Sequence, residues 1–258
     1  HIKLTSVHAE PDGTFPNGIP NPLLPEKRQS TTDAVVAHGA DFGVAFDGDF
    51  DRCFFFDGAG NFIEGYYVVG LLARAMLQGA ADGTAIVYDN RMTWATLAAI
   101  EEAKGRAVVS RTGHIFLKRL VRENAAPYGG EMSAHHYFHD FFSCDSGMIP
   151  WLLMAQLVGA SDQSLGDLVA DAQQAFPCSG EINFRVDDAG AVLDRMRAAF
   201  DGQGERIEID GLTYEFDDWR FNVRSSNTEP LLRLNVETRG DRALLDRQTE
   251  ALKALIQG

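Results

Sequence analysis

Between residues 66 and 123, helix-like and strand-like segments alternate along the chain, and this alternation limits the possible folds more than any other feature. Short apolar runs are separated by longer segments whose apolar residues recur every three or four positions. The pattern predicts helix 66–77, strand 85–88, helix 94–103, strand 107–110 and helix 115–123. Such alternation is typical of a layered α/β domain with a parallel sheet, in which ligands bind where the strands end.

The segments on either side of this unit follow different patterns. Residues 11–28 contain five prolines and two glycines, which exclude a regular helix or a central strand and predict an extended loop. Beyond residue 176, clustered strands are flanked by helices, which favours a separate small α+β domain. The other elements predicted outside the α/β unit are strands 42–46, 52–57, 181–186, 206–216, 219–224 and 231–238, and helices 146–158, 164–175, 188–200 and 242–256.

These patterns together predict an α/β fold, with layered domains of mixed or parallel sheets followed by a small α+β domain at the C-terminus. We expect three parts, formed by residues 1–62, 63–175 and 176–258. The first part would carry an acidic loop between two strands, the second the α/β unit, and the third the clustered strands.

The charge of the chain limits its partners. The sequence has 23 Lys and Arg against 37 Asp and Glu, a formal net charge of −14, which opposes attraction to nucleic acid or anionic membranes. We therefore expect neither as a partner. A small anionic substrate is still compatible with this charge, because local basic clusters can reverse the field within a cleft. One such cluster consists of Arg111, His114, Lys118, Arg119 and Arg122.

The three cysteines indicate a reducing compartment. Cys53, Cys144 and Cys178 are far apart and lack paired spacing, which argues against a disulfide framework or a thiolate zinc site and favours the cytoplasm. No apolar run reaches the roughly 18 residues of a membrane-spanning helix. The chain starts at His1 without a methionine, so we expect it to be a piece of a longer protein.

The acidic run that follows the apolar strand 42–46 predicts a metal site. Asp47, Asp49 and Asp51 alternate, so an extended or turning backbone can bring their carboxylates together, where they repel unless a hard cation such as Mg²⁺ neutralises them. An ordinary solvated acidic turn is the alternative. An EF-hand is excluded, because Arg52 and Gly58 occupy the positions that need Gly and Glu.

The same run allows a second enzymatic interpretation. In phosphatases of the haloacid dehalogenase type, the first Asp after a strand is the nucleophile, within a signature that resembles Asp-x-Asp-Gly-Thr. Here Phe50 and Asp51 stand in place of the Gly and Thr. An aspartyl-phosphate trapped on Asp47 would establish this alternative.

A second candidate site lies in the Gly- and aromatic-rich stretch 128–142. Glu131, Ser133 and His135 offer a carboxylate, a hydroxyl and an imidazole within six residues. The first two can hydrogen-bond sugar hydroxyls, and the imidazole can move protons near neutral pH. A polar surface loop is the alternative. His136 and His139 stand among aromatic residues, so we predict no metal there.

A third candidate site is the polar segment 224–230. Its guanidinium, hydroxyl, amide and backbone N–H groups suit phosphate, although an ordinary turn between strands explains the composition equally well. Its candidate ligands are Arg224, Ser226, Asn227 and Thr228. His114 opens a predicted helix, where N–H groups favour an anion, and Arg91 follows a predicted strand. Helix capping and plain surface exposure are the alternatives for these two.

Taken together, these motifs resemble one family in their order and spacing. The family is that of the α-D-phosphohexomutases, and the likeness is greatest to the bacterial phosphomannomutases. The segments that carry it are Asp-Gly-Asp-Phe-Asp-Arg (47–52), Thr-Gly-His (112–114), Gly-Glu-Met-Ser-Ala-His-His-Tyr-Phe (130–138), Cys-Asp-Ser-Gly-Met (144–148) and Arg-Ser-Ser-Asn-Thr-Glu-Pro (224–230).

The resemblance implies an enzyme of four domains that interconverts mannose 6-phosphate and mannose 1-phosphate, with Mg²⁺, a phosphoserine and a bound hexose 1,6-bisphosphate. It does not separate mannose from glucose phosphates. By position, it implies metal ligands at Asp47, Asp49 and Asp51, with Arg52 beside the phosphoserine. It also implies sugar contacts at Glu131 and Ser133, an acid/base at His135, a phosphate cradle at Arg224, Ser226, Asn227 and Thr228, and accessory substrate contacts at Arg91 and His114.

The sequence departs from the family pattern in two ways. Phe50 replaces a Gly that is common in the metal loop, and the first domain, with its phosphoserine in a Thr-Ala-Ser-His-Asn-Pro-like loop, has no counterpart. The resemblance therefore implies that residues 1–62 are a remnant of the second domain and that the N-terminal domains of the same protein are a missing partner. We expect the chain alone to be inactive as a mutase. A sugar-phosphate binding module is the alternative.

Overall fold

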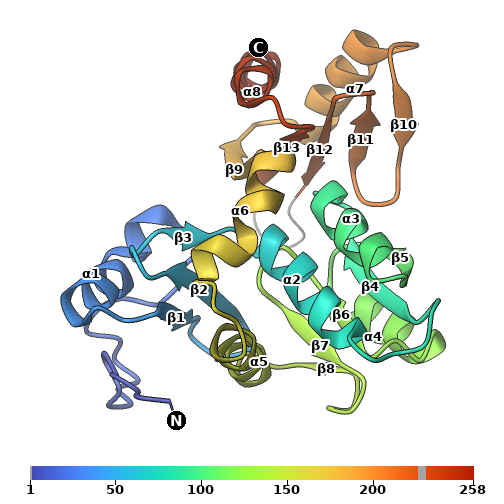
Figure 1. Cartoon of the computed structure of the whole chain (residues 1–258). Coiled ribbons are helices and arrows are strands. Elements are labelled where there is room, and N and C mark those ends of the chain that lie inside the picture. Colours follow the sequence, from blue (N-terminus) through green and yellow to red (C-terminus); the bar gives the residue numbers. More distant parts are fainter. Residues whose placement is uncertain (1, 226–230) are drawn as a thin grey trace.

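The computed structural model describes residues 2–225 and 231–258. It is a mixed α/β structure with one three-stranded and two five-stranded sheets, and Figure 1 shows them as three groups along the chain. Within the described residues, no helix is both long and apolar enough to cross a membrane.

The N-terminal part is a small antiparallel sheet covered by a helix. The sheet has the order β1-β2-β3, and strands β1 and β2 form a hairpin whose connecting loop is the acidic run 47–52. The sequence patterns did not predict α1, which ends at Gly39 in the left-handed conformation that glycine favours (φ 56°). The elements are the 3₁₀ helix Pro25–Lys27, α1 (Gln29–His38), β1 (Phe42–Phe46), β2 (Cys53–Asp57) and β3 (Phe62–Ile63).

The central part confirms the predicted α/β layering. Its sheet has the order β5-β4-β6-β7-β8; β5, β4 and β6 run parallel, whereas β7 and β8 are antiparallel. Helix α2 is buried along most of its length. The elements are α2 (Gly65–Leu77), β4 (Ala85–Asp89), α3 (Trp94–Glu102), β5 (Arg106–Ser110), α4 (His114–Glu123), β6 (Tyr128–Gly130), β7 (His136–Phe138), β8 (Cys144–Asp145), α5 (Met148–Gly159) and α6 (Leu165–Ala175).

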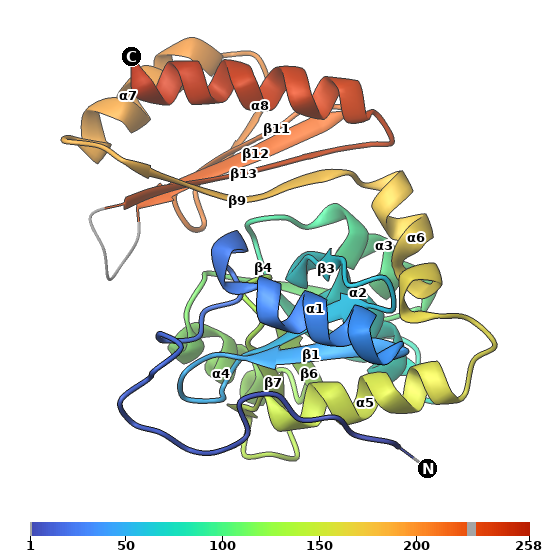
Figure 2. The same ribbon diagram turned by 90° about the vertical axis from the view of Figure 1, so that its left-hand side faces the viewer.

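The C-terminal part is an antiparallel sheet with helices α7 and α8 on one face, as Figure 2 shows. Its strand order is β10-β11-β12-β13-β9. Apolar side chains such as Phe221 and Leu234 face these helices and are fully buried. The elements are β9 (Cys178–Arg185), α7 (Ala189–Phe200), β10 (Glu205–Ile207), β11 (Leu212–Glu215), β12 (Trp219–Ser225), β13 (Leu231–Thr238) and α8 (Arg242–Gln257).

Strand β9 begins at Cys178, three residues earlier than the sequence pattern indicated. Gly180 has a positive φ of 66°, and the pairing with β13 shifts register between Asn235 and Glu237. The hydroxyl of Ser179 accepts a hydrogen bond from Val236 N at 2.9 Å. Gly180 therefore forms a bulge inside the strand.

The other face of the C-terminal sheet is polar and packs against the central part. On strands β12 and β13, Arg220 lies opposite Glu237 and Asn222 opposite Asn235, and all four are at most 2% exposed. Arg220 Nη2 donates to the Asn90 carbonyl at 3.1 Å. The two parts are thus joined by hydrogen bonds at the ends of β4 and α3 rather than by a shared apolar core.

Candidate active site

The acidic loop between β1 and β2 brings three carboxylates together. One oxygen from each of Asp47, Asp49 and Asp51 lies within 4.8 Å of the others. Phe50 makes this turn in the left-handed backbone region (φ 63°), where most residues are disfavoured. That conformation gives a physical reason for the glycine that is common at this position of the resembling family.

The loop fits a hard cation such as Mg²⁺, which prefers oxygen ligands. Asp51 Oδ1 is shielded from solvent and has no hydrogen-bond partner within the described residues, so it is available to a metal. Asp47 is 3% exposed, and its Oδ2 accepts a 2.6 Å hydrogen bond from Arg52 Nε. Burial raises the pKa of Asp47 while Arg52 opposes this. Arg52 therefore holds one of the three carboxylates in place.

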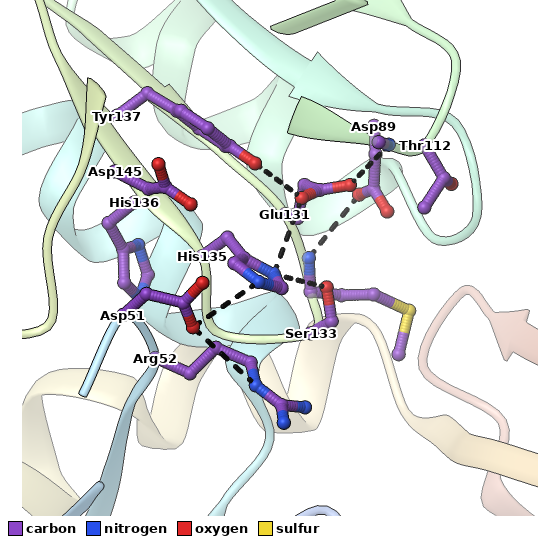
Figure 3. Close-up of polar contacts among 12 residues, drawn as sticks. Asp51, Arg52, Asp89, Thr112, Glu131, Ser133, His135, His136, Tyr137 and Asp145 are labelled. Atoms are coloured by element: carbon purple, nitrogen blue, oxygen red, sulfur yellow. Dashed lines mark hydrogen bonds and ion pairs between the residues drawn. The ribbon is translucent and has the colours of Figure 1, made fainter. Parts of the chain in front are cut away.

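His135 belongs to segment 131–135, the predicted sugar-binding loop (below, the sugar loop), and joins it to the acidic loop. Its Nε2 lies 3.6 Å from Asp51 Oδ1, and its Nδ1 lies 3.4 Å from Glu131 Oε2 and 3.3 Å from Ser133 Oγ, as Figure 3 shows. Burial lowers the pKa of His135, but the nearby Asp51 carboxylate and the charge of Glu131 outweigh this and raise it. The imidazole is thus set to carry a proton between two carboxylates.

Glu131 is fixed by donors on both of its oxygens. It is 2% exposed; its Oε1 accepts from Gly113 N and its Oε2 from Tyr137 Oη, both at 2.8 Å. The Gly113 contact ties the sugar loop to the 112–114 loop, where His114 is exposed at the start of α4. Because the residues involved follow the parallel strands β5 and β6, they meet at one edge of the sheet.

Arg91 braces the sugar loop from the end of β4. It is 1% exposed, forms an ion pair with Asp89, and donates from Nη2 to Ser133 Oγ at 3.0 Å. Burial lowers the pKa of Arg91, but Asp89 and Glu181 outweigh this and raise it. Its Nη1 reaches Glu181 Oε2 on β9 at 3.2 Å. Arg91 therefore contacts both the sugar loop and the C-terminal sheet.

Arg224 lies on the polar face of the C-terminal sheet and is 3% exposed. Its Nη2 is 4.0 Å from Glu181 Oε2, which places it near Arg91. The other predicted cradle residues, Ser226, Asn227 and Thr228, lie outside the described residues.

The described candidate residues other than His114 therefore form a connected group from the acidic loop through His135 to Arg91 and Arg224. Sequence reasoning missed three members. Asp89 had a usable signal in its position at the end of a parallel strand, but Tyr137 and Glu181 stand in strands whose pairing the sequence does not show.

Comparison with known proteins places the chain in a family. Three models of the phosphoglucomutase/phosphomannomutase family match it: α/β/α domain II at residues 1–60, α/β/α domain III at residues 64–176, and the C-terminal domain at residues 181–255. The chain belongs to the phosphoglucomutase/phosphomannomutase family, that of the α-D-phosphohexomutases.

The relatives are proteins of greater length. The chain is 59% identical over 258 residues to a protein of Xanthomonas campestris described as phosphohexose mutases, and 57% identical over 256 residues to a phosphomannomutase of Salmonella typhimurium. The matches span 100% and 99% of this chain, but only 57% and 56% of those two proteins. The chain thus spans a little over half the length of the curated relatives it matches.

Solved structures agree with this assignment. A phosphoglucomutase/phosphomannomutase family protein of Burkholderia thailandensis superposes with a TM-score of 0.79 at 30% identity, over 95% of this chain and 53% of that one. A structure described as a putative phosphomannomutase of Thermus thermophilus gives a TM-score of 0.71 at 18% identity, over 91% of this chain and 50% of that one. The second likeness shows the fold alone.

Proposed function

We propose that this chain is part of a phosphomannomutase, which interconverts mannose 6-phosphate and mannose 1-phosphate through a phosphoserine and a hexose 1,6-bisphosphate. The observation that carries the proposal is His135, held between Asp51 of the acidic loop and Glu131 of the sugar loop. This contact links a metal-binding loop to a sugar-binding loop, as a phosphoryl transfer to a sugar hydroxyl requires. The relatives described as phosphomannomutases support mannose over glucose.

In this proposal Asp47, Asp49 and Asp51 hold Mg²⁺, which when bound withdraws charge from the transferring phosphoryl group. His135 takes up and returns the proton of the reacting hydroxyl at an imidazole nitrogen. Glu131, fixed by donors on both oxygens, orients the sugar hydroxyls together with Ser133.

The substrate's other end is held by the C-terminal sheet. We assign the phosphate that does not react to Arg224 with Ser226, Asn227 and Thr228, and accessory contacts to Arg91 and His114. Because these residues would contact phosphate rather than the sugar ring, they could bind either phosphate of the bisphosphate. The bisphosphate has to turn around between the two transfers, so both ends must fit. The matched models support the proposed division into parts 1–62, 63–175 and 176–258.

The phosphoserine itself has to come from elsewhere. The 258 residues contain no Ser-His dipeptide, which the family's Thr-Ala-Ser-His-Asn-Pro-like loop requires. We therefore expect the chain alone to bind sugar phosphate without interconverting it. Robust turnover of mannose 1-phosphate by the purified 258-residue chain would refute this expectation.

Calorimetric titration tests the binding function. The chain should bind mannose 1-phosphate in the presence of Mg²⁺, and Glu131→Gln should weaken this binding because Gln presents an amide NH₂ to the donors that fix one of the two oxygens. Arg242→Gln, an exposed change on α8 (71% exposed), is the matched control. If the chain does not bind either mannose 1-phosphate or glucose 1-phosphate, the proposal fails. A clear preference for the glucose ester would replace phosphomannomutase by phosphoglucomutase.

A further inference from the structure

Two carboxylates from different parts of the chain hold the loop 112–114, which leads from β5 into α4. Thr112 N donates to Asp210 Oδ2 at 3.2 Å, and the next N–H along the chain, that of Gly113, donates to Glu131 Oε1 at 2.8 Å. Gly113 has a φ of 122°, a conformation that glycine adopts far more readily than other residues. The Thr112 hydroxyl has no hydrogen-bond partner within the described residues, so it does not anchor the loop. The two carboxylates are therefore the groups that fix this turn.

Asp210 is itself fixed by the C-terminal sheet. It lies between β10 and β11, and its carbonyl oxygen accepts a 2.8 Å hydrogen bond from Nδ2 of the fully buried Asn222. Gly211, the next residue, has a φ of 71°, and a Cβ there would lie 2.4 Å from the Val223 carbonyl oxygen and 2.5 Å from Arg224 Cβ. The turn thus packs directly on the backbone of β12. The sheet, rather than a free loop, sets the position of the Asp210 carboxylate.

Asp210 also lies close enough to Arg224 for its charge to act on that side chain. Burial, and then the charge of Arg91, lower the pKa of Arg224, whereas nearby carboxylates, that of Asp210 included, oppose this decrease. The contacts therefore form a continuous series from the C-terminal sheet, through Asp210 and the loop 112–114, to Glu131.

Glu131 depends on this series for one of its two oxygens. It is 2% exposed, and Tyr137 Oη holds the other oxygen, Oε2, at 2.8 Å. A displacement of the loop 112–114 would withdraw the Gly113 donor from Oε1. A buried carboxylate oxygen that loses its donor is costly, so Glu131 would leave the orientation that it has with both donors in place.

We propose that Asp210 is a positioning residue of the candidate active site: it holds the loop 112–114 so that Gly113 keeps Glu131 in the orientation that binds the sugar. Asp210 acts through the loop and does not itself contact the substrate. The inference rests on the proposed function only in taking Glu131 to bind sugar hydroxyls. A contact made by the C-terminal sheet thereby sets the geometry of a side chain in the sugar loop. A tie between the two parts that has no effect on Glu131 is the alternative.

Amide hydrogen exchange of the 258-residue chain, resolved by residue with NMR, tests this role without any ligand. Asp210→Ala should speed exchange of the Thr112 amide about tenfold, because its acceptor is removed. The Gly113 amide should exchange faster too, although its own acceptor is unchanged, and this second effect distinguishes a positioning role from a simple tie. Asp210→Asn, which keeps one acceptor oxygen, should fall between Asp210→Ala and the unchanged chain. Asp217→Ala, at an exposed position between β11 and β12, is the matched control and should alter neither amide.

Titration calorimetry with mannose 1-phosphate gives the functional readout. Asp210→Ala should weaken binding about tenfold, the effect of losing one charge-assisted hydrogen bond. In a Glu131→Gln background the same change should weaken binding less than it does alone, because both substitutions act on one contact. Thermal unfolding of each variant checks that it is folded.

The outcomes separate this inference from the proposed function. Faster exchange at Thr112 alone overturns the inference, as does a Thr112 amide that is unprotected in the unchanged chain, because the contact is then not formed in solution. Unchanged affinity in Asp210→Ala, or full additivity with Glu131→Gln, overturns it too. If the chain binds neither mannose 1-phosphate nor glucose 1-phosphate, the proposed function fails, while exchange at Gly113 still decides whether Asp210 positions the loop.

Discussion

Glu237→Gln should destabilise the junction between the C-terminal sheet and the central part more than any exposed charge change. Glu237 is fully buried. Its Oε1 accepts from Arg220 Nη1 and from Thr93 N, both at 2.7 Å. Its Oε2 accepts from Trp94 N at 3.2 Å and from Tyr66 Oη. Glutamine keeps one acceptor oxygen but turns an NH₂ group toward the remaining donors.

The expected loss of unfolding free energy follows from the buried charge of Arg220, which the substitution leaves without its main partner. Arg220 is 2% exposed, and breaking a buried ion pair by removing one partner costs about 3–5 kcal/mol. Arg220 keeps a 3.1 Å contact with the partly exposed Glu215, which places the expected loss near the lower end, about 3 kcal/mol. Replacing both partners, as Glu237→Leu with Arg220→Met, should not recover it, because Thr93 N, Trp94 N and Tyr66 Oη would then lose their buried acceptor.

Urea unfolding followed by tryptophan fluorescence measures this loss, since Trp94 and Trp219 are buried on the two sides of the junction. Asp246→Asn is the control: it removes the partner of Arg242 in an exposed pair at 3.9 Å, which contributes little. A Glu237→Gln variant within 1 kcal/mol of the unchanged chain would refute the reasoning.

Three further predictions concern single residues. Burial, and then the charge of the neighbouring imidazole, lower the pKa of His136 to about 3, against about 6.5 when unfolded. Between these pH values the unfolded chain binds a proton that the folded chain does not, so the free energy of unfolding falls on acidification by up to about 1.4 kcal/mol per pH unit. Denaturation of His136→Phe should lack this pH dependence. An unchanged pH dependence would contradict the prediction. In Gly147→Ala an added Cβ would lie 2.5 Å from the Phe50 carbonyl oxygen, so calorimetry should show weaker Mg²⁺ binding; Gly159→Ala, with no neighbour within 4 Å, is the control, and equal affinities would contradict the prediction. Ser164→Ala removes the capping box of α6 and should cost about 1 kcal/mol in thermal unfolding; no change in midpoint would mean that the cap is dispensable.

Local periodicity accounts for the elements that could be predicted. The α/β unit was predictable because its apolar spacing is strong and its strands are short. Helix α1 was not, because residues 29–38 are polar and β-branched and only Val35 is buried. Helix α1 owes its place to packing on β1 and β2, which is a tertiary effect.

Sequence proximity likewise decides which site contacts could be predicted. The three aspartates of the acidic loop are neighbours in sequence, so their spacing alone predicts that they converge, and the structure brings their oxygens together. The contact between Asp51 and His135 joins distant segments and depends on how the central part packs. Glu181 had no local signal, because its partners Arg91 and Arg224 belong to other strands and loops.

The polar face of the C-terminal sheet shows why alternation can mislead. The alternation Arg-Leu-Asn-Val-Glu along β13 is typical of a strand with one face in water, yet Asn235 and Glu237 are completely buried. On this face the central part takes the place of solvent, because its backbone carbonyls and N–H groups hydrogen-bond Arg220 and Glu237. An interface of this kind gains less from the hydrophobic effect than an apolar core does and depends on satisfied hydrogen bonds. Within the described chain, oxygens of Asn222 and Asn235 have no partner. We therefore expect the junction to separate at a lower cost than either apolar core unfolds, because these buried amide oxygens weaken its hydrogen-bond network.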